Sequence, residues 1–330
     1  RLAEETQNAS IGRALVLCSA SRRDEAAKAI ARFDQGVAFL CDASQTNIPR
    51  EAYDNAMADL EAEGADGIIA FGGGSPIGLG KAMAAKTGLP LIAVATTYSG
   101  SERAPNWYIG VGAAREQGAG LAALPAAVIY DPDLTLGLPP AVSAASGMNA
   151  MAHAVESLYG PDTNPVIQAL SEEAIRKLAG GLKGIVADGS NIEARHDALY
   201  GAWLAAQFRA TSGLEHVLAQ QIRSRFTLGH ALCHAIAVPY AIAYNAPAAP
   251  DAMVRIERAL GVEDAGSGLY ELNRALGLAT GYVEIGMPEN GLDDAVDAIM
   301  GRKFPNPRAV TRDELKTVVG QAMKGGPPRF

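Results

Sequence analysis

Short, unbroken apolar runs alternate with amphipathic stretches over the first 138 residues of the chain. Apolar runs of this length are typical of parallel strands that are covered on both faces. They predict five strands, at residues 13–19, 36–41, 66–71, 91–95 and 126–130. Between two of them, residues 50–63 repeat apolar positions at Ala52, Ala56 and Leu60, as one face of a helix does. Strands and helices in alternation predict an open α/β sheet.

The pattern becomes helical after Leu138, where two prolines follow one another. Predicted helices cover residues 148–158, 165–178, 192–208, 228–244 and 252–260. Thr311 followed three residues later by Glu314 predicts a capping box at the start of a last helix. We therefore predict an α/β domain over residues 1–138 and an all-helical domain over residues 139–330.

Composition and charge exclude several classes of protein. With 48% hydrophobic and 19% charged residues in 330, the chain is globular rather than disordered. A net charge of -8, with scattered cations, argues against a nucleic-acid partner. No apolar stretch approaches the roughly 18 residues of a membrane span, and the charged start shows no signal peptide. Cys18, Cys41 and Cys233 form no paired motif, so we expect a reducing, cytoplasmic setting.

A glycine-rich turn follows the third predicted strand. Residues 72–80 read GGGSPIGLG, which is neither the GxGxxG pattern nor a P-loop. Gly73, Gly74, Ser75 and Gly78 allow a close backbone approach, and the helix that follows offers free N–H groups to an anion. We predict that this turn binds the pyrophosphate of a dinucleotide. The alternative is a plain strand-to-helix turn with no ligand.

Two further polar segments follow predicted strands. Thr96, Thr97 and Ser101 lie in the turn TTYSGSE after the fourth strand, at the edge where open α/β sheets bind ligands. Asp42 follows the second strand and is a candidate for the ribose hydroxyls, the alternative being a solvated turn residue. All four are therefore candidate cofactor-binding residues.

Four of the five histidines fall in two small groups in the helical half. His153 follows Asn149 by four residues, so both lie on one helix face, and His216, His230 and His234 come from later segments. A pair of side chains on one helix face, together with histidines from other segments, is the arrangement that a mononuclear metal site needs. For any single histidine, a core or surface residue is the alternative.

These segments resemble the iron-containing alcohol dehydrogenase family, as do residues 130–135, 146–156, 197–204 and 244–250. The resemblance runs from the first predicted strand nearly to the end. It implies a dehydroquinate synthase-like architecture, in which a dinucleotide-binding α/β domain precedes an all-helical domain, with NAD(H) or NADP(H) and substrate between them. It also implies a homodimer acting on a small anionic substrate.

The resemblance places a metal site at Asn149, His153, His216 and His230, with an aspartate expected where Asn149 stands. An amide is a poor ligand, so we expect a vestigial site with no tightly bound metal. This matches the branch of the family that reduces maleylacetate-type unsaturated keto acids to 3-oxoadipate in the degradation of aromatic compounds. The implied activity is therefore an NAD(P)H-dependent reduction.

The sequence departs from the family pattern at three places. Gln220 replaces a histidine that serves proton movement, and glutamine cannot exchange a proton near neutral pH. Arg103 and Arg223 add cations that, with Asn149, are candidates for binding substrate carboxylates. The family's first strand is apparently missing ahead of Arg1. The candidate catalytic residues are His153, His216, His230, His234, Gln220 and Tyr98.

Two other functions stay open from the sequence. Three histidines can suffice for zinc, which would allow a metal-dependent alcohol or aldehyde dehydrogenase of the same family. The loss of the relay histidine would also suit a family relative with non-redox chemistry.

Overall fold

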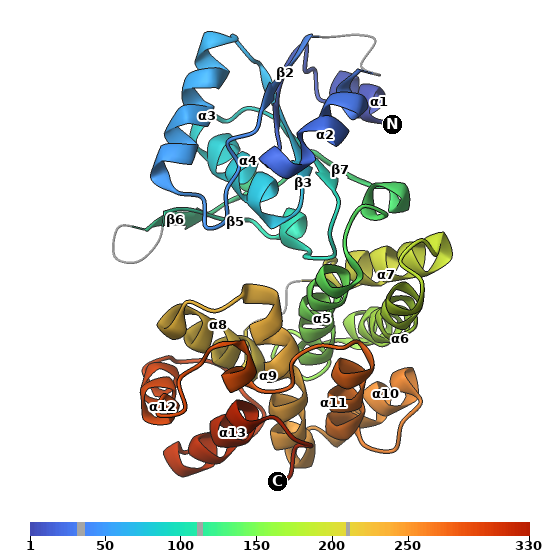
Figure 1. The fold of residues 1–330 in the computed structure, drawn as a ribbon, viewed down its shortest axis with the longest axis vertical. Coiled ribbons are helices and arrows are strands. Elements are labelled where there is room, and N and C mark those ends of the chain that lie inside the picture. Colours follow the sequence, from blue (N-terminus) through green and yellow to red (C-terminus); the bar gives the residue numbers. More distant parts are fainter. Residues whose placement is uncertain (32–36, 111–114, 209–211) are drawn as a thin grey trace. The chain divides into compact units, whose positions relative to one another are not determined.

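The structure is a computed structural model, and it describes residues 1–31, 37–110, 115–208 and 212–330. It divides into two compact units, Arg1–Thr135 and Leu136–Phe330, which are described separately below (Figure 1). The two units divide after Thr135, three residues before the boundary that the sequence predicts after Leu138.

The first unit is built on a parallel sheet with the strand order β2-β1-β3-β4-β7. The five strands are β1 (Arg13–Leu17), β2 (Val37–Cys41), β3 (Gly67–Gly72), β4 (Leu91–Ala95) and β7 (Ala127–Tyr130). Each corresponds to one predicted apolar run, which confirms the open α/β sheet. Gly36, the predicted start of the second run, lies outside the described residues.

Helices cover both faces of this sheet, as Figure 1 shows. They are α1 (Leu2–Asn8), α2 (Arg23–Ile30), α3 (Arg50–Ala62) and α4 (Gly74–Thr87). Leu15 and Leu17 of β1 point into the core formed with α3 and α4, whereas Ala14 and Val16 point into the core formed with α1 and α2. Burial on both faces explains why these strands are unbroken apolar runs.

An antiparallel hairpin of β5 (Asn106–Ile109) and β6 (Glu116–Ala119) lies in the same unit and was not predicted. The sequence of β6 is EQGA, which lacks the apolar alternation of a half-buried strand. Short 3-10 turns complete the connections of the chain: η1 (Ala20–Arg22), η2 (Ser101–Arg103), η4 (Leu121–Ala123), η5 (Pro132–Thr135), η6 (Ala246–Ala248) and η7 (Tyr282–Ile285).

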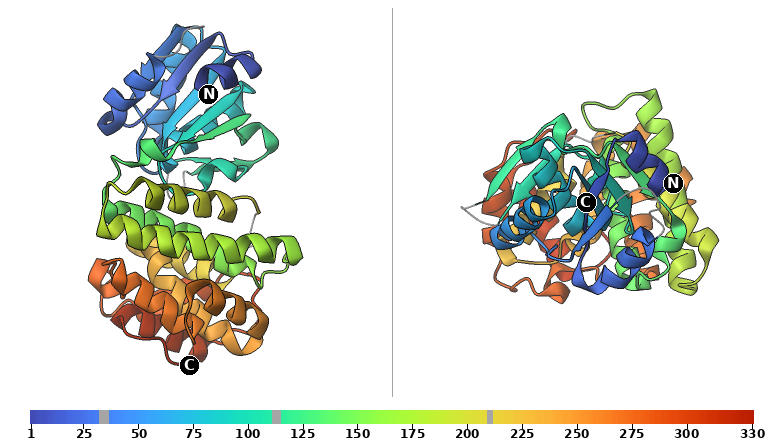
Figure 2. Two further views of the ribbon diagram at one scale, coloured as in Figure 1. Left: turned by 90° about the vertical axis from the view of Figure 1, so that its right-hand side faces the viewer. Right: turned by 90° about the horizontal axis from the view of Figure 1, so that it is seen from above.

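The second unit is helical throughout its described residues. Its helices are α5 (Pro140–Ser157), α6 (Pro165–Ala187), α7 (Ile192–Ala205), α8 (Leu214–Phe226), α9 (His230–Asn245), α10 (Pro250–Leu260), α11 (Ala265–Ala275), α12 (Leu292–Met300) and α13 (Arg312–Lys324). The predicted all-helical domain is thus confirmed. In Figure 2 the long α6 lies alongside α7.

Two helices are longer than predicted, for local reasons. The first, α5, begins at Pro140 rather than at residue 148, because proline is well suited to the first position of a helix. The second, α6, continues through Gly181 to Ala187. A Cβ at Gly181 would lie 2.6 Å from the backbone nitrogen of Ala198, so this glycine lets α6 and α7 pack closely.

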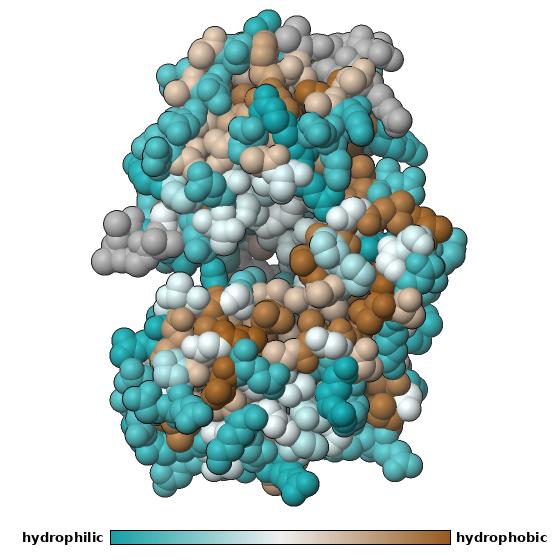
Figure 3. Space-filling model, viewed as in Figure 1, coloured by the Kyte–Doolittle hydropathy of each residue, from teal (hydrophilic) through white to brown (hydrophobic). Residues whose placement is uncertain are grey.

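The last helix begins with the predicted capping box. Thr311 Oγ1 accepts the Glu314 N–H at 3.3 Å, and Glu314 Oε2 accepts the Thr311 N–H at 3.2 Å. In Figure 3 hydrophilic side chains dominate the face of the helical unit around α12 and α13, and hydrophobic ones form a band over the region of α8 and α9. No described helix combines the length and apolarity needed to cross a membrane.

Candidate active site

The glycine turn joins β3 to α4, as predicted, and its glycines have different tasks. A Cβ at Gly73 would lie 2.7 Å from Thr97 Cγ2, and one at Gly78 would lie 2.8 Å from Ile48 Cδ1, so both allow close packing. A Cβ at Gly74 would meet nothing within 4 Å. The open face at Gly74, at the N-terminus of α4, is therefore where an anion can approach the free N–H groups. Ser75 stands beside it, half-buried.

The turn after β4 lies against the glycine turn. The backbone N–H of Thr96 donates to the carbonyl oxygen of Gly72 at 3.1 Å, and Lys81 Nζ donates to the Ser101 carbonyl oxygen at 2.8 Å. The first bond brings Thr96 and Thr97 next to Gly73, as expected for the carboxyl edge of a parallel sheet, and the second holds Ser101 against Lys81 of α4.

A buried polar pair supports this second turn and was missed in the sequence. The Tyr130 hydroxyl donates to Glu102 Oε1 at 2.8 Å, and burial raises the pKa of Glu102. Tyr98, a predicted catalytic residue, is fully buried in the same unit.

Asp42 follows β2 at the same edge of the sheet. Its carboxylate accepts a hydrogen bond from Arg23 at 2.8 Å, and both side chains are about half exposed. An acidic residue at this place suits a ribose 2′-hydroxyl, and a nearby arginine suits a 2′-phosphate. Arg23 was not predicted, because its helix is amphipathic and arginine is common on such surfaces.

The four predicted histidines come together in the helical unit. His153 lies on α5, His216 in the first turn of α8, and His230 and His234 one turn apart at the start of α9. Neighbouring ring centroids lie 4.4 Å apart for His153 and His216, 5.0 Å for His216 and His234, and 4.7 Å for His234 and His230. The order runs from His153 through His216 and His234 to His230, which we call the histidine row. His216 and His234 are buried, His153 is half-buried and His230 is exposed.

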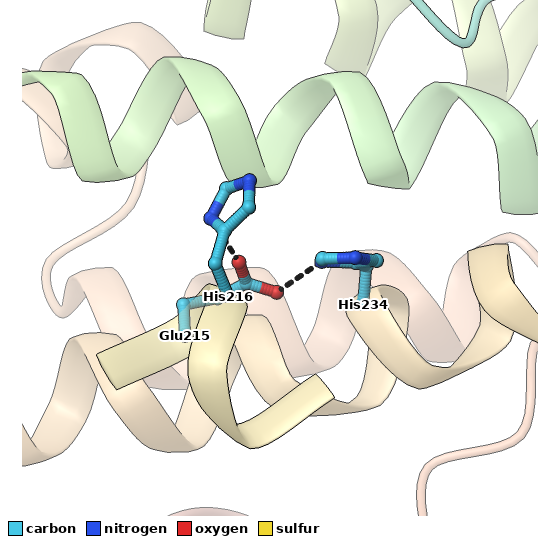
Figure 4. A group of neighbouring side chains, drawn as sticks. All are labelled: Glu215, His216 and His234. Carbon is cyan, nitrogen blue, oxygen red and sulfur yellow. Dashed lines mark hydrogen bonds and ion pairs between the residues drawn. The ribbon is translucent and has the colours of Figure 1, made fainter. Parts of the chain in front are cut away.

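Two buried carboxylates that were not predicted hold the histidine row. Glu156 Oε2 lies 2.6 Å from His216 Nδ1, and Glu215 Oε2 lies 2.8 Å from the same nitrogen. Glu215 Oε1 also accepts from His234 Nδ1 at 2.9 Å (Figure 4). On its other side, His216 Nε2 lies 2.9 Å from His153 Nδ1.

These contacts decide the protonation of the row. Burial alone would lower the pKa of His216, but the charges and hydrogen bonds of Glu215 and Glu156 outweigh it and raise the pKa to about 10. Burial would raise the pKa of Glu215, and the facing His234 and His216 lower it instead. Burial and the charge of His216 hold the pKa of His153 well below its usual value. These opposite shifts favour a proton on His216 over one on His153, and the two rings meet at 2.9 Å between His216 Nε2 and His153 Nδ1.

The family's metal positions do not form a complete ligand set in this chain. Asn149 is buried on α5 and supplies a neutral amide in place of a carboxylate. His216 Nε2 and His153 Nδ1 lie 2.9 Å apart. Glu215, His216 and His234 also have ligand atoms within 4.8 Å of one another. Glu215 Oε1 is hydrogen-bonded to His234 Nδ1, and Glu215 Oε2 forms an ion pair with His216 Nδ1.

Other predicted site residues lie outside the histidine row. Gln220 is exposed on α8, one turn after His216, and Arg223 follows it, half-buried. Arg103 is exposed in the first unit, at the end of η2.

Comparison with known proteins agrees with this arrangement. Residues 1–132 match the iron-containing alcohol dehydrogenase family, and residues 143–323 match the C-terminal region of the same family. The chain belongs to the iron-containing alcohol dehydrogenase family. The predicted resemblance is thus confirmed, and the chain is an oxidoreductase.

Several relatives of known activity are similar over almost the whole chain. A maleylacetate reductase of Sphingobium indicum is 39% identical, covering 99% of this chain and 94% of that protein. One of Pseudomonas knackmussii is 37% identical with the same coverage. The solved structure of maleylacetate reductase from Agrobacterium tumefaciens is 33% identical with a TM-score of 0.94, covering 99% of this chain and 94% of that one.

The open face at Gly74 predicts a selective loss of cofactor binding. Gly74→Val fills the space that a pyrophosphate needs without touching a neighbour, so NAD(P)H binding is expected to disappear while the thermal unfolding midpoint stays close to that of the wild type. Gly180→Val, at another open glycine on the exposed face of α6, is the matched control and should bind normally. Unchanged cofactor affinity in a folded Gly74→Val protein would refute the assignment.

The neutral amide of Asn149 predicts weak metal binding. Purified wild-type protein is expected to carry well under one iron or zinc per chain by elemental analysis. Asn149→Asp restores an anionic donor beside the histidines and should bring the metal content close to one per chain. Asn191→Asp, at the N-cap of α7, tests the same substitution away from the site. One tightly held metal per wild-type chain would contradict the prediction.

Proposed function

We propose that this protein is a maleylacetate reductase, which transfers a hydride from NADH or NADPH to an unsaturated keto acid and forms 3-oxoadipate. The observation that carries this proposal is the near full-length similarity to several maleylacetate reductases. The open glycine turn supports nucleotide binding. The histidine row, which lacks the usual anionic metal ligand, supports chemistry without a metal Lewis acid.

The reaction balances without a metal. The hydride forms a bond to the alkene carbon, the alkene electrons move toward the conjugated carbonyl as an enolate, and a proton then adds to the neighbouring carbon. Because the carbonyl accepts the charge, the protein has to orient the partners, stabilise the enolate and deliver one proton. The nicotinamide supplies the hydride chemistry when it is bound.

The exposed end of the histidine row is the part that a substrate can reach. His234 is buried and His216 is enclosed by carboxylates, so we assign the relay of a proton from solvent to His230, with His153 beside the enolate. Burial and the charge of His234 lower the pKa of His230 to about 3, so the ring passes on a proton from water and does not store one. Glu156 and Glu215 neutralise the charge of His216. Attraction for the substrate carboxylates therefore falls to Arg223 and Arg103, with the Asn149 amide as a further contact.

We propose that the protein accepts both nucleotides. Asp42 provides an acceptor for the ribose hydroxyls of NADH, and the Arg23 guanidinium bonded to it provides a partner for the 2′-phosphate of NADPH. A homodimer and a cytoplasmic setting, with no nucleic-acid or membrane partner, stay predictions from the sequence.

The proposed function predicts that the purified protein oxidises NADH and NADPH in the presence of maleylacetate. Absorbance at the nicotinamide band follows the rate, and mass spectrometry is expected to identify 3-oxoadipate. Simple alcohols and aldehydes should be turned over far more slowly, and activity should survive a chelator. Cofactor binding without oxidation by maleylacetate or by any carbonyl compound tested would point to a relative with non-redox chemistry.

The absence of an imidazole at Gln220 predicts that turnover is limited by proton transfer. Gln220→His adds a group that exchanges protons near neutral pH, one turn beyond His216. General acid-base assistance is worth about 10² to 10⁴-fold, and an imidazole without supporting hydrogen bonds delivers less, so we expect kcat to rise about 10-fold. Gln221→His is the matched control, because the neighbouring position faces a different direction on α8. An unchanged kcat would show that Gln220 has no part in this step.

A further inference from the structure

Glu215 is a fully buried carboxylate that links two helices through two imidazoles. It is the second residue of α8 and is 0% exposed. Its two oxygens lie 2.8 Å from His216 Nδ1 on α8 and 2.9 Å from His234 Nδ1 on α9, as Figure 4 shows. The contact with His234 is a hydrogen bond and the contact with His216 is an ion pair, so a single carboxylate meets both rings on their Nδ1 side.

The link continues from α8 to α5. His216 Nε2 lies 2.9 Å from His153 Nδ1, so a rotation of the His216 ring would also break the contact with His153. Glu156 supports the same ring from α5, and its carboxylate accepts the backbone N–H groups of Gly213 and Glu215, each at 2.9 Å. These bonds leave Glu156 anchored to the backbone, whereas both contacts of Glu215 are with side chains of the row.

An isolated carboxylate at this depth would be strongly disfavoured, because it loses its hydration. Its presence is accounted for by the two imidazoles that face it. A divalent cation in the family's site would hold several imidazoles in one arrangement by binding their nitrogens. In this chain Asn149 weakens that arrangement, and Glu215 binds two of the rings from the opposite, Nδ1 side.

We propose that Glu215 is a positioning residue that orders the histidine row in place of a metal ion, directly at His216 and His234 and through His216 at His153. The ordering itself does not depend on which substrate is reduced. Its effect on turnover rests on the proposed function.

The first test compares Glu215→Gln with Glu172→Gln. The glutamine at position 215 keeps the shape of the side chain but removes its charge and one acceptor, whereas Glu172 forms ion pairs with Arg255 and Arg258 away from the row. In Glu215→Gln the ¹⁵N imidazole signals of His216 and His234 are expected to shift or broaden. With maleylacetate kcat should fall by about 10-fold to 100-fold, the usual range for a lost supporting contact, while KM for NADH changes less than about twofold. Glu172→Gln should leave all three unchanged.

The second test asks whether the effect of Glu215→Gln on the histidine row depends on the site having no metal. In the Asn149→Asp background loaded with zinc, the metal holds the imidazoles, so adding Glu215→Gln should change the ¹⁵N signals and the thermal unfolding midpoint much less than it does in the wild-type background. This is a double-mutant cycle, and a coupling between positions 149 and 215 is the expected result. Equal changes in both backgrounds would overturn the proposal.

Four further outcomes are decisive. Unchanged imidazole signals and kcat in Glu215→Gln would refute the positioning role. A stoichiometric metal in the wild type that is lost in Glu215→Gln would show that Glu215 is a ligand of a bound metal instead. If Glu215→Gln does not fold, Glu215→Asp keeps the charge but is too short to bridge both rings, so the signals of at least one ring should still change. A wild type with no reductase activity would refute the proposed function, and the signals would still test the ordering.

Discussion

Two carboxylates are buried in the helical unit and require hydrogen-bond donors. The donors that they find connect three helices, α5, α8 and α9. Glu156 is 1% exposed and Glu215 is 0% exposed. Glu156 on α5 accepts N–H groups from Gly213 and Glu215, at the N-terminus of α8, where unpaired N–H groups favour an anion. Glu156 is also hydrogen-bonded to His216, and Glu215 is hydrogen-bonded to His234. The histidine row is thus a consequence of satisfying buried charge.

The first unit also has a helix N-terminus with unpaired N–H groups, but there they face a candidate ligand site and not a carboxylate of the protein. At α4 the N-terminal N–H groups open toward Gly74, where no side chain of the described residues would touch an added Cβ. At α8 the corresponding groups are already occupied by a carboxylate of the protein itself. One helix start is therefore available to a ligand such as a pyrophosphate, and the other serves to fix the position of His216.

The sequence predicted best those features that follow from the pattern of apolar residues within one segment. The five parallel strands were predictable because burial on both faces leaves few polar residues, whereas β6 has no such pattern. His153 and Glu156 share a helix face at a spacing of three residues, so Glu156 could have been found from the same segment. Glu215 has no comparable signal. Adjacent residues on a helix point in different directions, and only the position of α9 shows that its carboxylate reaches both rings. Gly78 was assigned to the cofactor, although the side chain of Ile48 already accounts for it.

The combination of Asn149 and Glu215 matters more than either residue alone. The family pattern has an aspartate where Asn149 stands on α5, and this chain has Glu215 on α8 in contact with His216 and His234. The negative charge thereby stands on the Nδ1 side of the His216 ring, and the cation that balances it is a proton on the ring itself. That proton also makes Nε2 a donor, and the acceptor it faces is His153 Nδ1. Glu215 and Glu156 thus meet the His216 ring on its Nδ1 side, and His153 meets it on the Nε2 side, so the ring joins α5 and α8.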